Sequence, residues 1–173
     1  KDGGSTWIST TLDTLIDYRG LSFINPDTGW LAGTGNLGDY VWGYYGKIHR
    51  TTDGGITWQK QYGSDTTVTN PIEDDWFTDI KFINAQVGYA ITGAGGTLYS
   101  TTNGGHNWEK EGSAATYLAR IDVAIGDTVW GCGGLFVSTV DNGLNWISNA
   151  VLGGNVRDIS MINGSKGYVL ALS

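Results

Sequence analysis

The chain has 173 residues, of which 28 are glycine, 8 are tryptophan and only 2 are proline, and its net charge is −7. The acidic balance argues against nucleic acid and against an anionic membrane surface as the main partner, because both require a basic face. A hydrophobic content of 40% excludes a disordered chain, the scarcity of proline excludes collagen, and no apolar run approaches the ~18 residues of a membrane-spanning helix.

Two motifs alternate along the chain and set the expected order of its elements. The first is a turn of the type Thr-x-Asp/Asn-x-Gly that ends in tryptophan, with copies at 2–7 (truncated), 51–58, 101–108 and 139–146. The second is an apolar run followed after a short turn by another apolar run, with copies at 21–32, 80–91, 121–131 and 159–170. Because two independent motifs recur in the same order every ~40–50 residues, the chain is built from repeats.

Each full repeat predicts four short strands. In the second repeat these strands are expected at 77–84, 87–93, 96–102 and 106–111. Turns rich in glycine and asparagine separate them, and no apolar period of 3.6 residues lasts long enough for a helix. Four-stranded units with this spacing are typical of β-propeller blades, so we predict an all-β propeller segment of about 3.5 blades from a ring of roughly 6–8.

The blades are expected in chain order within one propeller segment that spans residues 1–173. The ranges are 1–7 for the end of a preceding blade, 8–58, 59–108 and 109–146 for full blades, and 147–173 for a partial blade. A propeller needs ~4–8 blades to close. We therefore expect further blades of the same longer chain, or a second copy, to complete the ring.

The repeated tryptophan turn has a physical logic of its own. The Asp53 carboxylate can accept backbone N–H groups two residues on, and Gly55 supplies a positive φ that a side chain would oppose. Trp58 then places a large ring between blades. Asparagine can replace the aspartate because its side-chain oxygen makes the same turn. The residues with this structural role are Asp2, Trp7, Asp53, Gly55, Trp58, Asn103, Gly105, Trp108, Asp141, Gly143 and Trp146.

These turns resemble the Asp-box, or BNR, repeat, whose pattern is Ser/Thr-x-Asp-x-Gly-x-Thr-Trp, and the match is strongest at 51–58. The companion unit, Phe-Ile-Asn followed by Gly-Trp or Gly-Tyr, resembles the Asp-box propellers that include the photosystem II assembly factors. Similar repeats occur in bacterial secreted and cell-surface proteins. The resemblance implies that the aspartates are scaffold, because the box occurs in sialidases, xyloglucanases and non-enzymatic propellers alike. It also favours an extracellular, cell-surface or periplasmic location.

Two insertions are expected on the propeller face opposite to the Asp-box turns, one at 35–46 and one at 63–76. Their aromatic side chains are candidates for contact with a protein or a sugar ring, with packing on the neighbouring blade as the alternative. These candidates are Tyr40, Trp42, Tyr44, Tyr45 and Trp76. The acidic run at 73–75 lacks the ligand alternation of a calcium loop, so it is interpreted as a solvated turn and no metal site is predicted.

Three of the four arginines, Arg19, Arg120 and Arg157, lie just before expected innermost strands. The starts of these strands surround the axis of a propeller on the same face as the insertions. Three guanidinium groups there would form a mouth that binds a carboxylate or a phosphate. The side chains beside them in the sequence are Tyr18, Tyr117, Asp17 and Asp158. Ordinary ion pairs with these aspartates are the alternative.

The function that these features favour is a non-catalytic binding or scaffold module that engages a protein or glycan partner, without catalytic residues and without a cofactor. One alternative is a fragment of a sialidase-like glycoside hydrolase, a family that uses an arginine cluster and a tyrosine nucleophile paired with a glutamate. However, its Arg-Ile-Pro segment is absent, and no glutamate lies near Tyr18 or Tyr117 in the sequence. A photosystem assembly factor-like protein is the other alternative. The single cysteine, Cys132, is expected to be an inert core residue.

Overall fold

The computed structural model describes residues 4–12, 15–36, 44–63, 76–124, 128–149 and 156–172. These residues form fourteen strands in four antiparallel sheets, and they contain no helix that could cross a membrane. Three of the sheets have four strands and the last has two. The predicted all-β fold of four-stranded units followed by a partial unit is therefore confirmed.

Each sheet is a meander in which strands that follow one another in the sequence pair side by side. The first sheet contains β1 (Ile16–Phe23), β2 (Gly29–Asn36), β3 (Tyr44–Thr51) and β4 (Gln59–Tyr62). The second contains β5 (Phe77–Phe82), β6 (Gly88–Thr92), β7 (Thr97–Thr101) and β8 (Glu109–Ser113). The third contains β9 (Leu118–Ala124), β10 (Thr128–Gly133), β11 (Phe136–Thr139) and β12 (Ile147–Ser148), and the last contains β13 (Val156–Asn163) and β14 (Lys166–Ala171).

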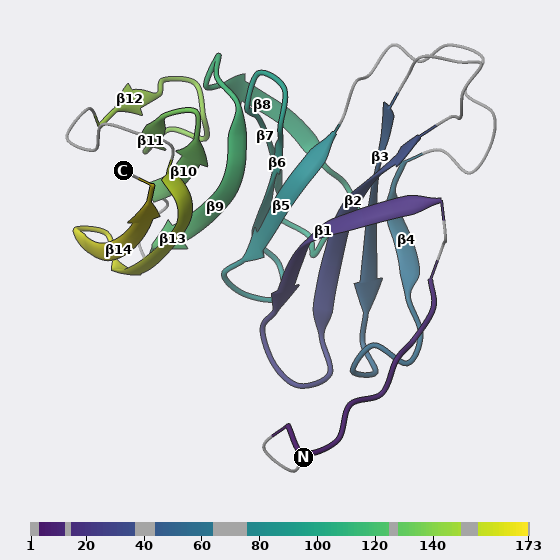
Figure 1. Ribbon diagram of the computed structural model, residues 1–173. Coiled ribbons are helices and arrows are strands. Elements are labelled where there is room, and N and C mark those ends of the chain that lie inside the picture. The colour runs from purple at the N-terminus through teal and green to yellow at the C-terminus, as the bar shows by residue number, and fades with distance from the viewer. Residues whose placement is uncertain are drawn as a thin grey trace.

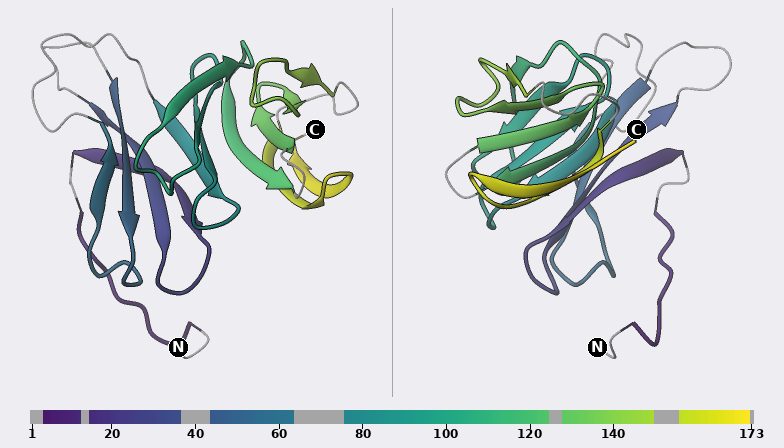
Figure 2. Two further views of the ribbon diagram at one scale, coloured as in Figure 1. Left: turned by 180° about the vertical axis from the view of Figure 1, so that it is seen from behind. Right: turned by 60° about the vertical axis from the view of Figure 1, so that its left-hand side comes forward.

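The sheets follow one another along an arc, as Figures 1 and 2 show. The first strand of each sheet faces its counterparts, so β1, β5, β9 and β13 lie next to one another in chain order. Residues 4–12 leave the first sheet as an extended segment, in which Trp7 is 89% exposed (Figure 1). Four-stranded meanders arranged around a row of inner strands are the architecture of a β-propeller.

Apolar clusters fill the spaces between consecutive sheets and hold the blades together. The cluster between the first and second sheets contains Trp30, Ala32, Ile48, Phe77, Ile80, Phe82, Ala90 and Tyr99. The cluster between the second and third sheets contains Tyr89, Ile91, Leu98, Leu118, Ile121, Val129 and Val137. The cluster between the third and last sheets contains Cys132, Val156 and Ile159. Cys132 is fully buried, as expected for a core residue.

The sheets divide the chain at positions different from the expected blade boundaries. The expected full blades end at the tryptophan of each turn, at residues 58, 108 and 146. The sheets instead end one strand later, at Tyr62, Ser113 and Ser148. Backbone pairing explains the difference, because β4 pairs with β3, for example Gln59 with Arg50. The tryptophan turn therefore lies inside a sheet, as the hairpin between its third and fourth strands.

All four strands expected in the second repeat are present. The first three, β5, β6 and β7, lie within the expected ranges. The fourth, β8, begins at Glu109 rather than at residue 106, because the turn that ends in Trp108 occupies the intervening residues.

Candidate binding site at the start of the inner strands

Each inner strand carries one extra residue near its start. The pairing with the second strand of the sheet skips a residue at Arg19, Thr78, Ala119 and Arg157, which occupy equivalent positions in the four sheets. An inserted residue of this kind bends the strand and redirects its side chain. Two of the three candidate arginines are therefore bulge residues, and Arg120 directly follows the bulge of β9.

A cluster of one cation and two aromatic rings joins the starts of three inner strands. The Arg19 guanidinium lies 5.0 Å from the centroid of the ring of Trp76, which immediately precedes β5. Trp76 meets Tyr117, which immediately precedes β9, at 6.5 Å between ring centroids. Asp17 fixes Arg19 within β1, with 2.6 Å between Nη2 and Oδ2. Because Tyr117 is 45% exposed, this Arg19–Trp76–Tyr117 cluster presents an open aromatic surface.

Gly93, which follows β6, positions both rings of the cluster. Its N–H donates to the Trp76 carbonyl at 2.8 Å, and its carbonyl accepts the Leu118 N–H at 3.2 Å. A β-carbon at this glycine would lie 3.2 Å from the Tyr117 ring and 3.0 Å from the Thr78 methyl group. The absence of a side chain at Gly93 therefore allows the two aromatic residues to approach the same loop.

Arg120 and Asp79 form a more enclosed part of this end of the propeller. Nη1 of Arg120 donates to the carbonyl oxygens of Ala119 at 2.8 Å and of Thr78 at 3.5 Å. Asp79 is 9% exposed and accepts the Ile121 N–H of the next sheet at 3.0 Å. Burial raises the pKa of Asp79 to about 6, although the hydrogen bonds that it accepts and the Arg120 charge act in the opposite direction. A half-buried cation thus lies close to a buried carboxyl group that titrates near neutral pH.

Arg157 is exposed at the bulge of β13, and it makes no ion pair with any of the described residues. The adjacent Asp158 instead accepts the Ile159 N–H through Oδ1 at 2.9 Å. An ordinary ion pair with a neighbouring aspartate was the alternative to a shared ligand. Arg19 forms such an ion pair with Asp17. The three arginines lie at the same end of their strands but have different partners, and their convergence on one ligand stays a prediction.

Tyr45 is the aromatic residue of the first insertion whose side chain the structure describes. It is half-buried, its ring occupies the space beside Gly35, and the Lys47 ammonium lies 5.5 Å from its centroid. Tyr45 therefore packs within its own sheet rather than being free for contact with a partner. Tyr44 opens β3, and only its backbone is described. Outside the described residues lie 37–43, which include Tyr40 and Trp42, and 64–75, which include the acidic run.

Of the two tyrosines that lie beside the arginines in the sequence, Tyr117 belongs to the cluster and Tyr18 does not. Tyr18 precedes Arg19 directly, yet its hydroxyl lies 3.2 Å from Nδ1 of His49 on β3. Arg19 is the bulge residue of β1, and the bulge redirects its side chain away from that of Tyr18. Tyr117 and Trp76, both named from the sequence, each immediately precede an inner strand.

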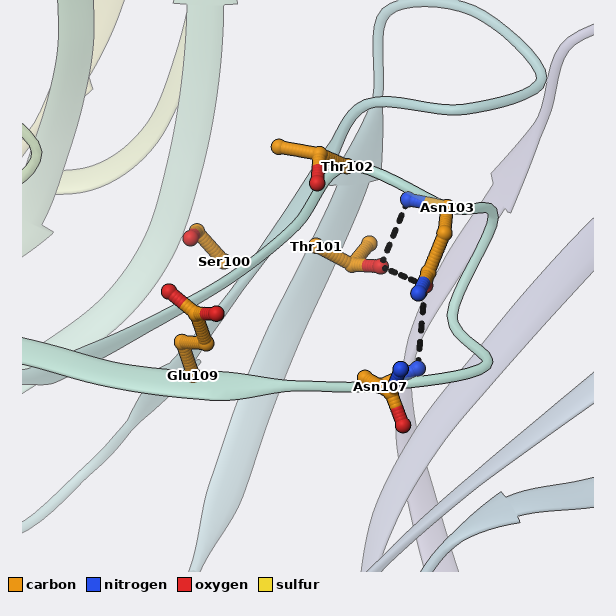
Figure 3. Close-up of a pocket in the computed structure, with 6 residues that line it drawn as sticks. All are labelled: Ser100, Thr101, Thr102, Asn103, Asn107 and Glu109. Atoms are coloured by element: carbon orange, nitrogen blue, oxygen red, sulfur yellow. Dashed lines mark hydrogen bonds between the residues drawn. The ribbon is translucent and has the colours of Figure 1, made fainter.

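The Asp-box turns lie at the opposite end of the sheets, as predicted from their place between the third and fourth strands. Figure 3 shows the turn of the second sheet, where Asn103 Oδ1 accepts the Thr101 hydroxyl at 3.0 Å and the Asn107 N–H at 2.9 Å. The predicted positive φ is present, at 89° for both Gly55 and Gly105. Asparagine therefore replaces aspartate in this turn as expected.

The hydrogen bonds of the first turn correct one expectation. Asp53 Oδ1 accepts the Thr57 N–H at 2.9 Å, so the donor lies four residues on rather than two. The reason is that the Thr51 hydroxyl already accepts the nearer Gly55 N–H, at 2.9 Å. Hydrogen bonds from Thr57 and Thr51 lower the pKa of Asp53 to about 2, and the equivalent bonds from Asn145 lower the pKa of Asp141.

The turn tryptophans pack between sheets where a preceding sheet is present. Trp108 packs against the cluster between the first and second sheets, and Trp146 against the cluster between the second and third. Trp58, in the first sheet, meets Phe23 at 6.2 Å between ring centroids. The predicted inter-blade position is therefore confirmed for Trp108 and Trp146.

Substitution of Asp53 tests the turn. Asp53→Ala is expected to lower the melting temperature, because the Thr57 N–H loses its acceptor. Asp53→Asn is expected to lower it less, because the amide oxygen can keep the Thr57 N–H, as Asn103 Oδ1 keeps the Asn107 N–H, while the Thr57 hydroxyl loses its acceptor. Asp27→Ala is the control, because it removes an exposed carboxylate of the neighbouring loop. Thermal unfolding followed by circular dichroism measures all three, and equal melting temperatures for the alanine and asparagine variants at position 53 would contradict the assigned role.

Metal ligation and cysteine chemistry were also considered for the described residues. Those residues contain no group of three or more His, Cys, Asp or Glu side chains that could hold a metal ion. Burial raises the pKa of the Cys132 thiol to about 12, so the reactive thiolate is suppressed.

Four-stranded meanders packed through a row of inner strands define the chain as a segment of a β-propeller. Among solved structures it is similar to a chain described as YCF48 bound to D1 peptide, with a TM-score of 0.60 and 20% identity, over 92% of this chain and 50% of that chain. It is also similar to YCF48 from Cyanidioschyzon merolae, with a TM-score of 0.49 and 16% identity, over 88% and 62% of the two chains. No family model and no curated protein matches it. The similarity shows the fold, and the chain spans about half the length of the first solved chain.

Proposed function

We propose that this chain is a non-catalytic propeller segment that binds an extended segment of a partner protein at the start of its inner strands. The Arg19–Trp76–Tyr117 cluster carries the proposal, because it draws on three sheets and leaves aromatic surface open. Aromatic rings and guanidinium groups are enriched at protein interfaces and contribute most of the binding energy there.

The charges of the site favour a partner segment that carries a carboxylate near an apolar or aromatic side chain. The apolar group would lie on the rings of Trp76 and Tyr117, and the carboxylate would pair with a guanidinium group. Arg157 is the best placed for this role, since it is exposed and without an ion pair among the described residues. A solved chain of the same fold is described as bound to D1 peptide, so peptides are the partner class to test first.

The hydrolase alternative gains no support from the described glutamates. Glu109 and Glu111 lie on β8, the outermost strand of the second sheet, whereas Tyr117 lies at the start of an inner strand. Glu111 accepts a hydrogen bond from Ser100 at 2.7 Å. We therefore expect no hydrolysis of a fluorogenic sialoside. The glycan partner, the extracellular, cell-surface or periplasmic location and the photosystem assembly role stay predictions from the motif resemblance.

Fluorescence anisotropy with labelled peptides tests the binding site. The probes are the D1 peptide and a set of short peptides that each carry one aromatic and one acidic residue. Trp76→Ala and Arg19→Ala are each expected to weaken binding roughly tenfold or more, as truncation of an interface anchor does. Lys166→Ala is the matched control, because it removes one exposed positive charge at the other end of the β13–β14 hairpin. Binding that Lys166→Ala weakens as much as Trp76→Ala would contradict the proposed site.

A further inference from the structure

An aromatic residue recurs at the same position of each second strand, and in the first two sheets it contacts the next sheet. The second strands place Trp30, Tyr89, Trp130 and Tyr168 opposite the inner-strand residues Ser22, Lys81, Asp122 and Ser160. Trp30 stacks on Phe82 of the next sheet at 3.5 Å between centroids and donates its Nε1–H to the Gly104 carbonyl at 3.1 Å. Tyr89 donates its hydroxyl to Asn142 of the third sheet at 3.4 Å. In the first two sheets the aromatic residue at this position thus reaches over the following sheet and its turn, whereas Trp130 stacks on Phe136 of its own sheet at 5.4 Å between ring centroids.

Polar side chains of one inner strand also accept backbone N–H groups of the next. The three such hydrogen bonds are Ser22 Oγ with the Phe82 N–H at 2.9 Å, Asp79 Oδ2 with the Ile121 N–H at 3.0 Å, and Asp122 Oδ2 with the Met161 N–H at 2.6 Å. A buried N–H group needs an acceptor, so these bonds fix how one sheet sits on the next.

The last sheet exposes the same set of groups on its outer side. Tyr168 is 67% exposed, and Asp158 and Ser160 occupy the positions that Asp79 and Ser22 hold in earlier sheets. Asp158 uses only Oδ1 for its own strand, as Asp79 does, and its Oδ2 faces no donor among the described residues. A groove of about 200 Å³ is lined by Asp158, Ile159, Ser160, Tyr168, Val169 and Leu170. This side of the last sheet therefore carries, at equivalent positions, both kinds of acceptor and the aromatic ring that earlier sheets use in different combinations to contact their successors.

The first sheet exposes the complementary surface. Phe23 is 42% exposed and meets the edge of Trp58 at 6.2 Å and 88°. In the second sheet the equivalent Phe82 meets Trp108 at 5.8 Å and the same angle, and Trp30 covers its face. The first sheet therefore holds the same aromatic pair, without a covering ring among the described residues.

We propose that the last sheet binds the first sheet of a second copy of this chain, in the way that each sheet binds the next within one chain. Tyr168 covers the partner's Phe23, Ser160 accepts the Phe23 N–H, and Asp158 accepts the N–H of the partner's Leu21. This contact is head to tail, and two copies related by a twofold axis make it twice and close a ring.

The size of the contact predicts a reversible dimer. The last sheet has two described strands rather than four, so its contact is smaller than those within the chain. Interfaces at the small end of the range are weak, and dissociation constants of micromolar order are expected. The residues of this contact differ from those of the proposed peptide site, so the two proposals can fail separately.

Sedimentation velocity of the 173-residue chain over about 1–300 µM tests the proposal. A concentration-dependent dimer is expected. Phe23→Asp and Tyr168→Asp should each raise the dissociation constant roughly tenfold or more, because each places a carboxylate in the apolar contact. Leu144→Asp is the matched control, since it changes a 74% exposed apolar side chain away from both faces and should leave the dimer unchanged.

A mixture of the two variants identifies the head-to-tail arrangement. The Phe23→Asp chain keeps an intact last sheet and the Tyr168→Asp chain an intact first sheet, so together they form a heterodimer through one contact although each alone is monomeric. A symmetric contact between two first sheets would leave the Tyr168→Asp chain dimeric and would overturn the proposal. A monomer at every concentration, growth beyond the dimer, or a dimer insensitive to both substitutions would overturn it as well. If either variant lacks the wild-type circular dichroism spectrum, Phe23→Ala and Tyr168→Ala replace the pair.

Discussion

Replacing Phe82 by alanine is expected to lower the free energy of unfolding by about 3–5 kcal/mol, the loss typical of a buried aromatic side chain. Phe82 is 5% exposed, Trp30 stacks on its face at 3.5 Å and Trp108 meets its edge at 5.8 Å. Removal of the ring leaves a cavity between two sheets, which the surrounding backbone can fill only in part. Equilibrium unfolding in urea, followed by far-ultraviolet circular dichroism, measures the loss.

Phe23→Ala is the matched control for this substitution, because it removes the same side chain at the same position of the preceding repeat. Phe23 is 42% exposed and keeps a tryptophan at its edge, but among the described residues no ring covers its face. The expected loss is below about 1 kcal/mol when measured on dilute, monomeric protein. Equal losses in the two variants would contradict the view that the inter-sheet stack is a major source of stability.

Stability is expected to rise as the pH falls from about 7 to about 4, because of Asp79. Burial raises its pKa from 3.8 to about 6 in the folded chain, so the folded state binds the proton more tightly than the unfolded state does. The stabilisation is fully present below the unfolded pKa and is lost as the pH rises through the folded pKa. A shift of this size corresponds to about 3 kcal/mol.

Asp79→Asn separates this contribution from the other titrating groups. The amide keeps one oxygen acceptor for the Ile121 N–H and does not titrate, so the rise between about pH 6 and pH 4 should be absent in the variant. Urea unfolding of both proteins at several pH values gives the difference. Parallel stability curves for wild type and variant across this interval would contradict the raised pKa.

The turn aspartates act in a separate and lower pH range. The folded pKa of Asp53 is about 2 and lies below its usual 3.8, so its stabilising hydrogen bonds are present above pH 3.8 and are lost as the pH falls toward 2. Asp141 shifts in the same direction. Stability should therefore pass through a maximum near pH 4, with Asp79 responsible for the slope above it and the turn aspartates for part of the slope below it.

The repeat pattern predicted the strands well because turn chemistry and side-chain alternation act over a few residues. The positive φ of Gly55 and the exchange of aspartate for Asn103 are both confirmed for this reason. The blade boundaries could not be read in the same way. The repeat was recognised by its last conserved residue, Trp58, and this residue does not show where backbone pairing stops. Because Arg50 pairs with Gln59, the strand after Trp58 belongs to the same sheet.

The sequence named the residues of this cluster, but of their contacts it gave only the Arg19–Asp17 ion pair, as the alternative to a shared ligand. The sequence placed Tyr18 and Tyr117 beside the arginines at the starts of the inner strands, and it placed Trp76 at the end of an insertion. In the folded chain Tyr18 lies against His49, and Arg19 lies over Trp76. The bulge at Arg19 and the packing of β1 beside β5 produce this arrangement, and neither is a local property of the sequence.

The sequence by itself determined a repeat of four short strands with a tryptophan turn, and hence a partial β-propeller, because glycine, asparagine and aspartate specify turns through their own backbone and side-chain geometry. Only the tertiary structure decided that Arg19, Trp76 and Tyr117 form one cluster and that Phe23 and Tyr168 lie on two open, complementary faces. The physical reason is that these relations depend on how inner strands from different repeats pack against one another, and that packing is set by contacts between residues far apart in the chain.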